Sequence, residues 1–84
     1  MNEYYFTFRS MTRGQQAAIL LLQHGIVGNL VRTPKVLTSK GCGYAIAINR
    51  ADAYAAATIL RQERIGFDRV FRLGAGLMPE EVAL

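Results

Sequence analysis

This chain has almost none of the residues that hold a small protein together through covalent bonds or metal ions. Its 84 residues contain one cysteine, Cys42, one histidine, His24, and no tryptophan. A lone cysteine excludes a disulfide within the chain, and one cysteine with one histidine is too few for a Cys/His metal cage. No phosphate-loop or dinucleotide-binding pattern is present either. The sequence therefore predicts no metal site and no bound cofactor.

Long apolar runs and a targeting signal are also missing. The longest apolar run, Ala17–Leu22, is far shorter than the roughly 20 residues that cross a bilayer. The segment Met1–Phe8 contains Glu3 and lacks a basic region followed by a long apolar stretch, so it is not typical of a signal peptide. Together with the free thiol, these absences predict a cytoplasmic protein without a membrane partner.

The residues that are present predict one folded domain. Apolar side chains make up 51% of the chain and charged ones 19%, the opposite of the balance in disordered proteins. The length suits a single domain, and a chain this short buries only about 60% of its unfolded surface. The net charge of +4 permits an anionic partner but does not require one.

Hydrophobic patterning and turn residues divide the chain into strands, helices and a tail. Aromatic and β-branched residues favour strands, whereas apolar residues at helical spacing favour helices. We expect Ser10 or Thr12 to cap the first helix, Thr12 in a capping box with Gln15, and Asn49 to cap the second. Gly25 suits the position after the first helix, where φ is positive. The expected strands are 4–8, 27–32, 43–49 and 67–73, the expected helices 13–24 and 50–64, and the expected loose tail 74–84.

The order of these elements predicts an α+β fold. The order β-α-β-β-α-β is typical of a ferredoxin-like sandwich, in which both helices cover one face of an antiparallel four-stranded sheet. The right-handed crossover rule favours the spatial strand order 4-1-3-2. We therefore expect one ferredoxin-like domain over residues 1–73 and a flexible C-terminal tail over residues 74–84.

This topology places Cys42 at one end of the sheet, beside the start of the first helix. Cys42 ends the hairpin between the second and third strands, and the third strand neighbours the first. The free N–H groups of a helix N-terminus carry a partial positive charge and stabilise anions. A thiolate there would have a lowered pKa and a raised reactivity. The residues that we expect to stabilise it are Arg9, Ser10, Thr12, Arg13 and Lys40.

Other interpretations compete with a reactive thiol. Cys42 could be a small buried residue between two turn glycines. The same polar corner could hold an anionic ligand, although simple helix capping explains it. Tyr5 and Thr7 alternate onto the open face of the sheet, where RNA-recognition modules stack bases, but the third strand lacks their basic-Gly-aromatic signature, which argues against nucleic acid. That face could instead pair with another copy, as in a small dimeric interaction or ligand-sensing domain.

Several segments give the chain a family resemblance. The segment Arg32-Thr33-Pro34-Lys35 is followed at a short distance by Gly41-Cys42-Gly43-Tyr44, and the first helix ends in His24-Gly25-Ile26. With the aromatic first strand, these residues resemble the selenium/sulfur carrier-like proteins, a family of small bacterial domains, over Tyr4–Leu73. The chain departs from the family pattern at Gly14, where an alanine is common.

The resemblance implies a role for Cys42 and a set of partners. It implies that Cys42 carries sulfur or selenium as a persulfide or selenosulfide. It also implies a sulfur- or selenium-donor protein and an acceptor enzyme as partners, so that the chain is a carrier rather than an enzyme. The motif backbone that the resemblance places around the thiol consists of Thr33, Pro34, Lys35, Gly41 and Gly43.

Overall fold

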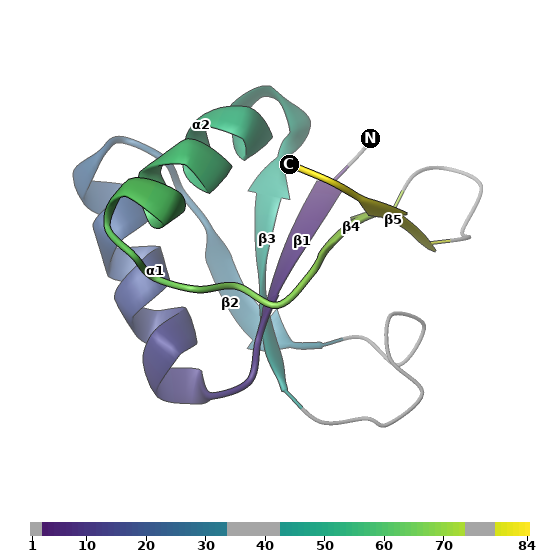
Figure 1. Cartoon of the computed structure of the whole chain (residues 1–84), viewed down its shortest axis with the longest axis horizontal. Coiled ribbons are helices and arrows are strands. Elements are labelled where there is room, and N and C mark those ends of the chain that lie inside the picture. Colours follow the sequence, from purple (N-terminus) through teal and green to yellow (C-terminus); the bar gives the residue numbers. More distant parts are fainter. Residues whose placement is uncertain (1–2, 34–42, 74–78) are drawn as a thin grey trace.

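The computed structural model describes residues 3–33, 43–73 and 79–84. The expected helices and strands are present in these residues, although β2 and β4 begin later than expected and α2 ends earlier. The elements follow the order β1 (Glu3–Phe8), α1 (Met11–Gln23), β2 (Asn29–Arg32), β3 (Tyr44–Asn49), α2 (Arg50–Gln62), β4 (Val70–Leu73) and β5 (Pro79–Val82) (Figure 1).

The strands form one antiparallel sheet in the order β2-β3-β1-β4-β5. The first four strands have the spatial order that the crossover rule predicted. The expected count of four strands is wrong, because Pro79–Val82, assigned to the loose tail, pairs with β4 as a fifth strand. Val82 lies opposite Val70, and Arg72 forms an ion pair with Glu80 across the two strands. These cross-strand pairs cover the edge that β4 would otherwise leave open.

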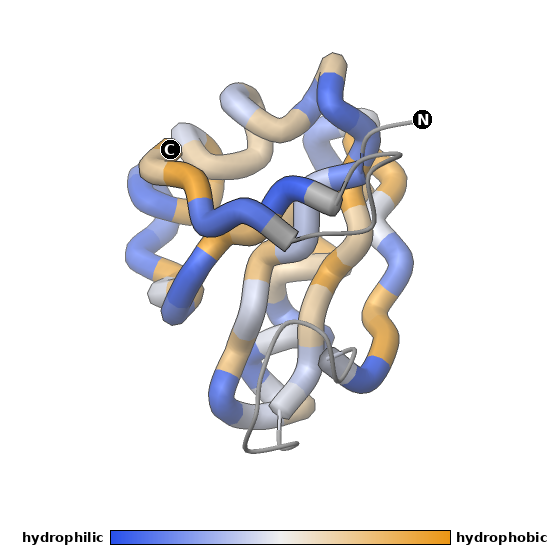
Figure 2. Tube along the Cα trace, turned by 90° about the vertical axis from the view of Figure 1, so that its right-hand side faces the viewer, coloured by the Kyte–Doolittle hydropathy of each residue, from blue (hydrophilic) through white to orange (hydrophobic). Residues whose placement is uncertain are grey.

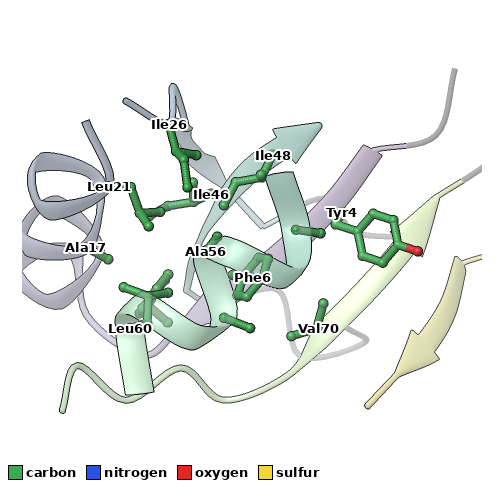
Figure 3. Packing of buried hydrophobic residues seen from close by; sticks show 13 residues of the cluster. Tyr4, Phe6, Ala17, Leu21, Ile26, Ile46, Ile48, Ala56, Leu60 and Val70 are labelled. Carbon is green, nitrogen blue, oxygen red and sulfur yellow. The ribbon is translucent and has the colours of Figure 1, made fainter. Parts of the chain in front are cut away.

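Both helices cover the same face of the sheet (Figure 1). In β1, Tyr4, Phe6 and Phe8 are buried, whereas the alternate residues Tyr5 and Thr7 are partly exposed on the other face. Side chains from both helices and the central strands close around this buried row (Figure 3). The other members of the core are Ala17, Leu21, Ile26, Ile46, Ile48, Ala53, Ala56, Ala57, Leu60 and Val70.

Gly14 brings α1 close to β2. A Cβ atom at this position would lie 2.8 Å from Cδ1 of Leu30, a distance at which Leu30 has to move. Alanine would favour the helix by about 1 kcal/mol relative to glycine. Because Cδ1 is the end of a flexible side chain, Leu30 can shift at low cost, and alanine at position 14 is compatible with this packing.

The two helices end in the same backbone motif with different residues. In each, an N–H beyond the helix donates to a carbonyl of the last turn at 2.9 Å, across a residue of positive φ. That residue is Gly25 after α1, as expected, and Arg64 after α2, with φ values of 81° and 59°. A residue with a Cβ costs about 1–2 kcal/mol in the left-handed conformation. Arg64 therefore occupies a position that the backbone alone would give to glycine.

Candidate functional site

The predicted site residues that the structure describes converge at one end of the sheet. Phe8, the last residue of β1, lies opposite Tyr44, the first residue of β3. Thr33, just beyond β2, donates its N–H to the carbonyl of Gly43 at 3.1 Å. The ends of β1 and β2 and the start of β3 therefore meet here, as the topology predicted. The predictions for Pro34, Lys35, Lys40, Gly41 and Cys42 lie outside the described residues.

Gly43 occupies a position that requires glycine. Its φ is +118°, and a Cβ atom there would lie 3.1 Å from the carbonyl oxygen of Phe8 and 3.6 Å from Oγ1 of Thr33. The carbonyl belongs to a paired strand and cannot move away readily, so both the backbone conformation and the space exclude a side chain. The residue that follows Cys42 in the chain is thus packed against the end of β1.

Helix α1 begins at the same end of the sheet with a capped N-terminus. Ser10 has an extended backbone, and its Oγ accepts a hydrogen bond from the N–H of Arg13 at 3.2 Å. Ser10 is therefore the N-cap, and the expected capping box of Thr12 and Gln15 is wrong, because Thr12 already lies inside the first turn. The first turn holds no acidic side chain, so nothing within it neutralises the partial positive charge of the helix end.

Arg9 and Arg13 both reach toward the segment that joins α2 to β4. Nε of Arg9 donates to Oδ2 of Asp68 at 3.3 Å. A Cβ atom at Gly66 would lie 3.8 Å from Nη1 of Arg13. Asp68 is itself anchored, because its N–H donates to the carbonyl of Thr7 at 2.8 Å. The sequence analysis did not identify Asp68. The only indication in the sequence was its position, as an acidic residue just before the strand that pairs with β1.

The sheet face opposite the helices presents half-exposed aromatic residues. Tyr5 lies opposite Phe71 of β4, and Oγ1 of Thr7 accepts a hydrogen bond from the N–H of Arg69 at 3.0 Å. Burial raises the pKa of the Tyr5 phenol, and the nearby carboxylate of Glu3 raises this pKa further. Tyr5 is therefore neutral at physiological pH. That this face does not bind nucleic acid stays a prediction.

The described residues contain neither a cluster of metal ligands nor a membrane span. No group of three or more His, Cys, Asp or Glu that could hold a metal ion occurs in residues 3–33, 43–73 and 79–84. Within the same ranges, neither helix has the length and apolar character needed to cross a bilayer. His24 is the exposed C-cap of α1, which agrees with its expected place at the helix end.

Comparison with known proteins finds one family. The family model described as "Putative Se/S carrier protein-like" matches residues 3–72, from the start of β1 into β4. The match includes Cys42 and all the other predicted site residues. No curated protein and no solved structure matches the chain.

Proposed function

Because this chain belongs to the Se/S carrier-like family, we propose that it carries one atom of sulfur or selenium on Cys42. The family match over residues 3–72 carries this proposal, since it includes the only cysteine of the chain. The chain receives the atom from a donor protein and delivers it to an acceptor enzyme, as a carrier rather than a catalyst. A ferredoxin-like domain over residues 1–73 fits the strand order β2-β3-β1-β4, with β5 as an addition at the edge.

The proposed chemistry is a redox-neutral transfer by a thiolate. The Cys42 thiolate attacks the terminal sulfur of a donor persulfide R–S–SH, so that a new S–S bond forms and the donor leaves as R–S⁻. The proton stays on the transferred sulfur, and selenium follows the same course from R–S–SeH. In delivery, a nucleophile of the acceptor attacks the terminal atom and the Cys42 thiolate leaves. A reducing cytoplasm, which keeps free thiols available, suits this role.

The surroundings of the hairpin end support a stabilised thiolate. Gly43 packs against the end of β1, where α1 also begins without an acidic residue in its first turn. The helix N-terminus would favour an anion on Cys42. Arg9 and Arg13 would contribute less, because Arg9 is paired with Asp68 and the guanidinium of Arg13 reaches toward Gly66. The proposed anion-stabilising residues are Arg9, Ser10, Thr12, Arg13 and Lys40.

Alkylation of Cys42 across a pH series tests the proposed thiolate. We expect the rate of reaction with iodoacetamide to follow an apparent pKa at least one unit below the value of about 8.5 for free cysteine. Unfolding the chain in denaturant should restore that value of about 8.5, which separates the effect of the fold from that of neighbouring residues. A folded-state pKa at or above the free value, together with slow labelling, would contradict the proposal.

Charge variants provide the matched controls for this measurement. Arg13→Gln should raise the pKa of the thiol, because it removes a positive charge beside the start of α1. Asp68→Asn should lower it, because Arg9 then loses its carboxylate partner. Arg50→Gln removes the same charge as Arg13→Gln at the opposite end of the sheet, where screening in salt makes its effect negligible.

Self-association is a second candidate role, and the distribution of exposed apolar residues favours it. Of the six large hydrophobic residues that are exposed in the described part of the chain, five lie on α1, on β2 or between them. Helix α1 carries one charged side chain, Arg13, and β2 is an edge strand. The exposed residues of α1 lie on the helix side of this edge, and Val31 lies on the other side, because Leu30 packs toward Gly14 of α1. Antiparallel pairing of two β2 edges is self-complementary and joins both sides. The five residues are Met11, Ile19, Leu22, Val27 and Val31.

Sedimentation at several protein concentrations tests this second role. We expect the wild-type chain to reach the mass of a dimer as its concentration rises, and Leu22→Lys to stay monomeric because it places a charge in the apolar surface. Tyr54→Lys adds the same charge on α2, at the sixth exposed residue, and should still form the dimer. A monomeric wild type, or a dimer that Leu22→Lys leaves intact, would exclude this interface.

A further inference from the structure

The corner between α2 and β4 holds a hollow that the proposed sulfur chemistry does not use. Its volume is about 460 Å³, which falls within the roughly 300–1,000 Å³ of small-molecule sites. Its walls come from the last turn of α2, the segment that follows it and the end of β5, where the chain turns from hydrophilic to hydrophobic toward the C-terminus (Figure 2). The apolar residues that line it are Leu60, Ile65, Phe67, Val70, Val82 and Leu84.

Arginine side chains outnumber acidic side chains around this hollow. Three arginines and two side-chain carboxylates line it. Both carboxylates are already paired. Asp68 lies 3.3 Å from Arg9, which follows β1, and Glu81 lies 3.9 Å from Arg69. Among the described residues, the remaining two arginines, Arg61 and Arg64, have no carboxylate within 4.0 Å. Their charge is therefore available to an anion.

Local structure positions these two arginines on the rim. The guanidinium group of Arg61 lies 5.6 Å from the centroid of the Phe67 ring, which in turn packs edge-on against Phe6 at 5.0 Å. Arg64 takes the left-handed position at the end of α2, which glycine takes at the end of α1. An arginine thus occupies a position whose backbone conformation favours glycine. Such local strain often marks a binding site.

We propose that this hollow binds an organic carboxylate that has an apolar body. The apolar walls cover the body, and the guanidinium groups of Arg61 and Arg64 hold the carboxylate, whose planar geometry they match. Nucleic acid fits less well, because Phe67, the one aromatic ring among the lining residues, already has Arg61 over its face. A small inorganic anion would leave the apolar walls uncovered. None of the lining residues is among the proposed anion-stabilising residues, and the proposal does not depend on the carrier role.

Titration of the full chain with octanoate, followed by amide chemical shifts in NMR spectra, tests the proposal. We expect saturable shifts at Arg64, Gly66, Phe67 and Val82. Acetate should bind at least about tenfold more weakly, because it lacks the apolar body. Octylammonium has the same body with the opposite charge and should produce no saturable shift at these amides.

Arg64→Gly separates loss of binding from loss of folding. Glycine prefers the left-handed backbone, so the variant should melt at or above the wild-type temperature. We expect it to bind octanoate about tenfold more weakly or worse, because an ionic hydrogen bond is lost. Arg50→Gln removes the same charge from the first turn of α2, outside the hollow, and should bind octanoate like the wild type.

Four results would overturn the proposal. Equal octanoate affinity in Arg64→Gly and the wild type would remove the arginine from the site. Equal binding of octylammonium would show that charge plays no part, and equal binding of acetate would show that the apolar walls play none. A single-stranded oligonucleotide that shifts the same amides where octanoate does not would assign the corner to nucleic acid.

Discussion

The Cys42→Ser variant is expected to keep the fold and to take up no sulfur or selenium. The thiolate is the nucleophile in the proposed transfer, and a serine hydroxyl cannot replace it at neutral pH. Incubation with a low-molecular-weight persulfide, and separately with a selenosulfide, followed by intact-protein mass spectrometry, measures the loading. The wild type should gain the mass of one chalcogen atom, and the variant should gain none. Circular dichroism of both proteins checks that the fold is unchanged.

A chemical control accompanies the Cys42→Ser variant. Wild-type chain that has first been alkylated at its thiol should behave like the variant, because Cys42 is the only cysteine in the sequence. A variant that still gains one chalcogen atom would show that another group takes it up. A wild type that gains none from either donor would contradict the carrier role itself.

Phe6→Ala is expected to cause a large loss of stability. Phe6 lies in the central strand β1 with 0% exposure, opposite Ile46 on one side and Val70 on the other, and its ring packs against Phe67. Removing a buried phenylalanine ring costs about 3–5 kcal/mol in free energy of unfolding. The whole chain has roughly 4–13 kcal/mol at its length. Between about a quarter and all of the stability therefore depends on this one ring.

Urea unfolding followed by circular dichroism measures this loss. Tyr54→Ala is the matched control, because it removes an aromatic ring from α2 that is 71% exposed. Its free energy of unfolding should stay within about 0.5 kcal/mol of the wild type. A loss below about 1 kcal/mol in Phe6→Ala would contradict the packing of the core around β1.

The local elements were readable from the sequence because their signals lie within short windows. Phe6 and Phe8 alternate with Tyr5 and Thr7, and the alternation appears in the structure as a buried face and an open face of β1. Ser10 was one of two predicted caps, because its hydroxyl needs only an N–H three residues later. The strand order followed from chain connectivity and handedness alone.

Strand β5 was missed because its own residues carry no strand pattern. Pro79, Glu80 and Glu81 are poor strand formers, and in Glu80–Val82 only Val82 packs against the core. The segment becomes a strand because β4 offers a free edge and because Arg69 and Arg72 provide partners for its two glutamates. The sequence of the segment itself identifies none of these partners.

The candidate site, too, could be predicted only in part from the sequence. The sequence indicated which end of the sheet Cys42 should approach, and the contact of Gly43 with Phe8 agrees with that end. The sequence did not reveal that Arg9 is paired, because its partner Asp68 is 59 residues away. The charge at this end of the sheet therefore depends on a contact that topology alone does not specify.

By itself, the sequence determined the α+β class, the order of the first four strands in the sheet and the presence of a single thiol. These properties follow from periodicity, connectivity and composition, which can be read from the chain without its three-dimensional structure. Only the tertiary structure decided the fifth strand, the pairing of Arg9 with Asp68 and the hollow beneath Arg61 and Arg64. These features depend on contacts between residues that are distant in the sequence. Such contacts form only when the core around Phe6 packs the two helices against the sheet.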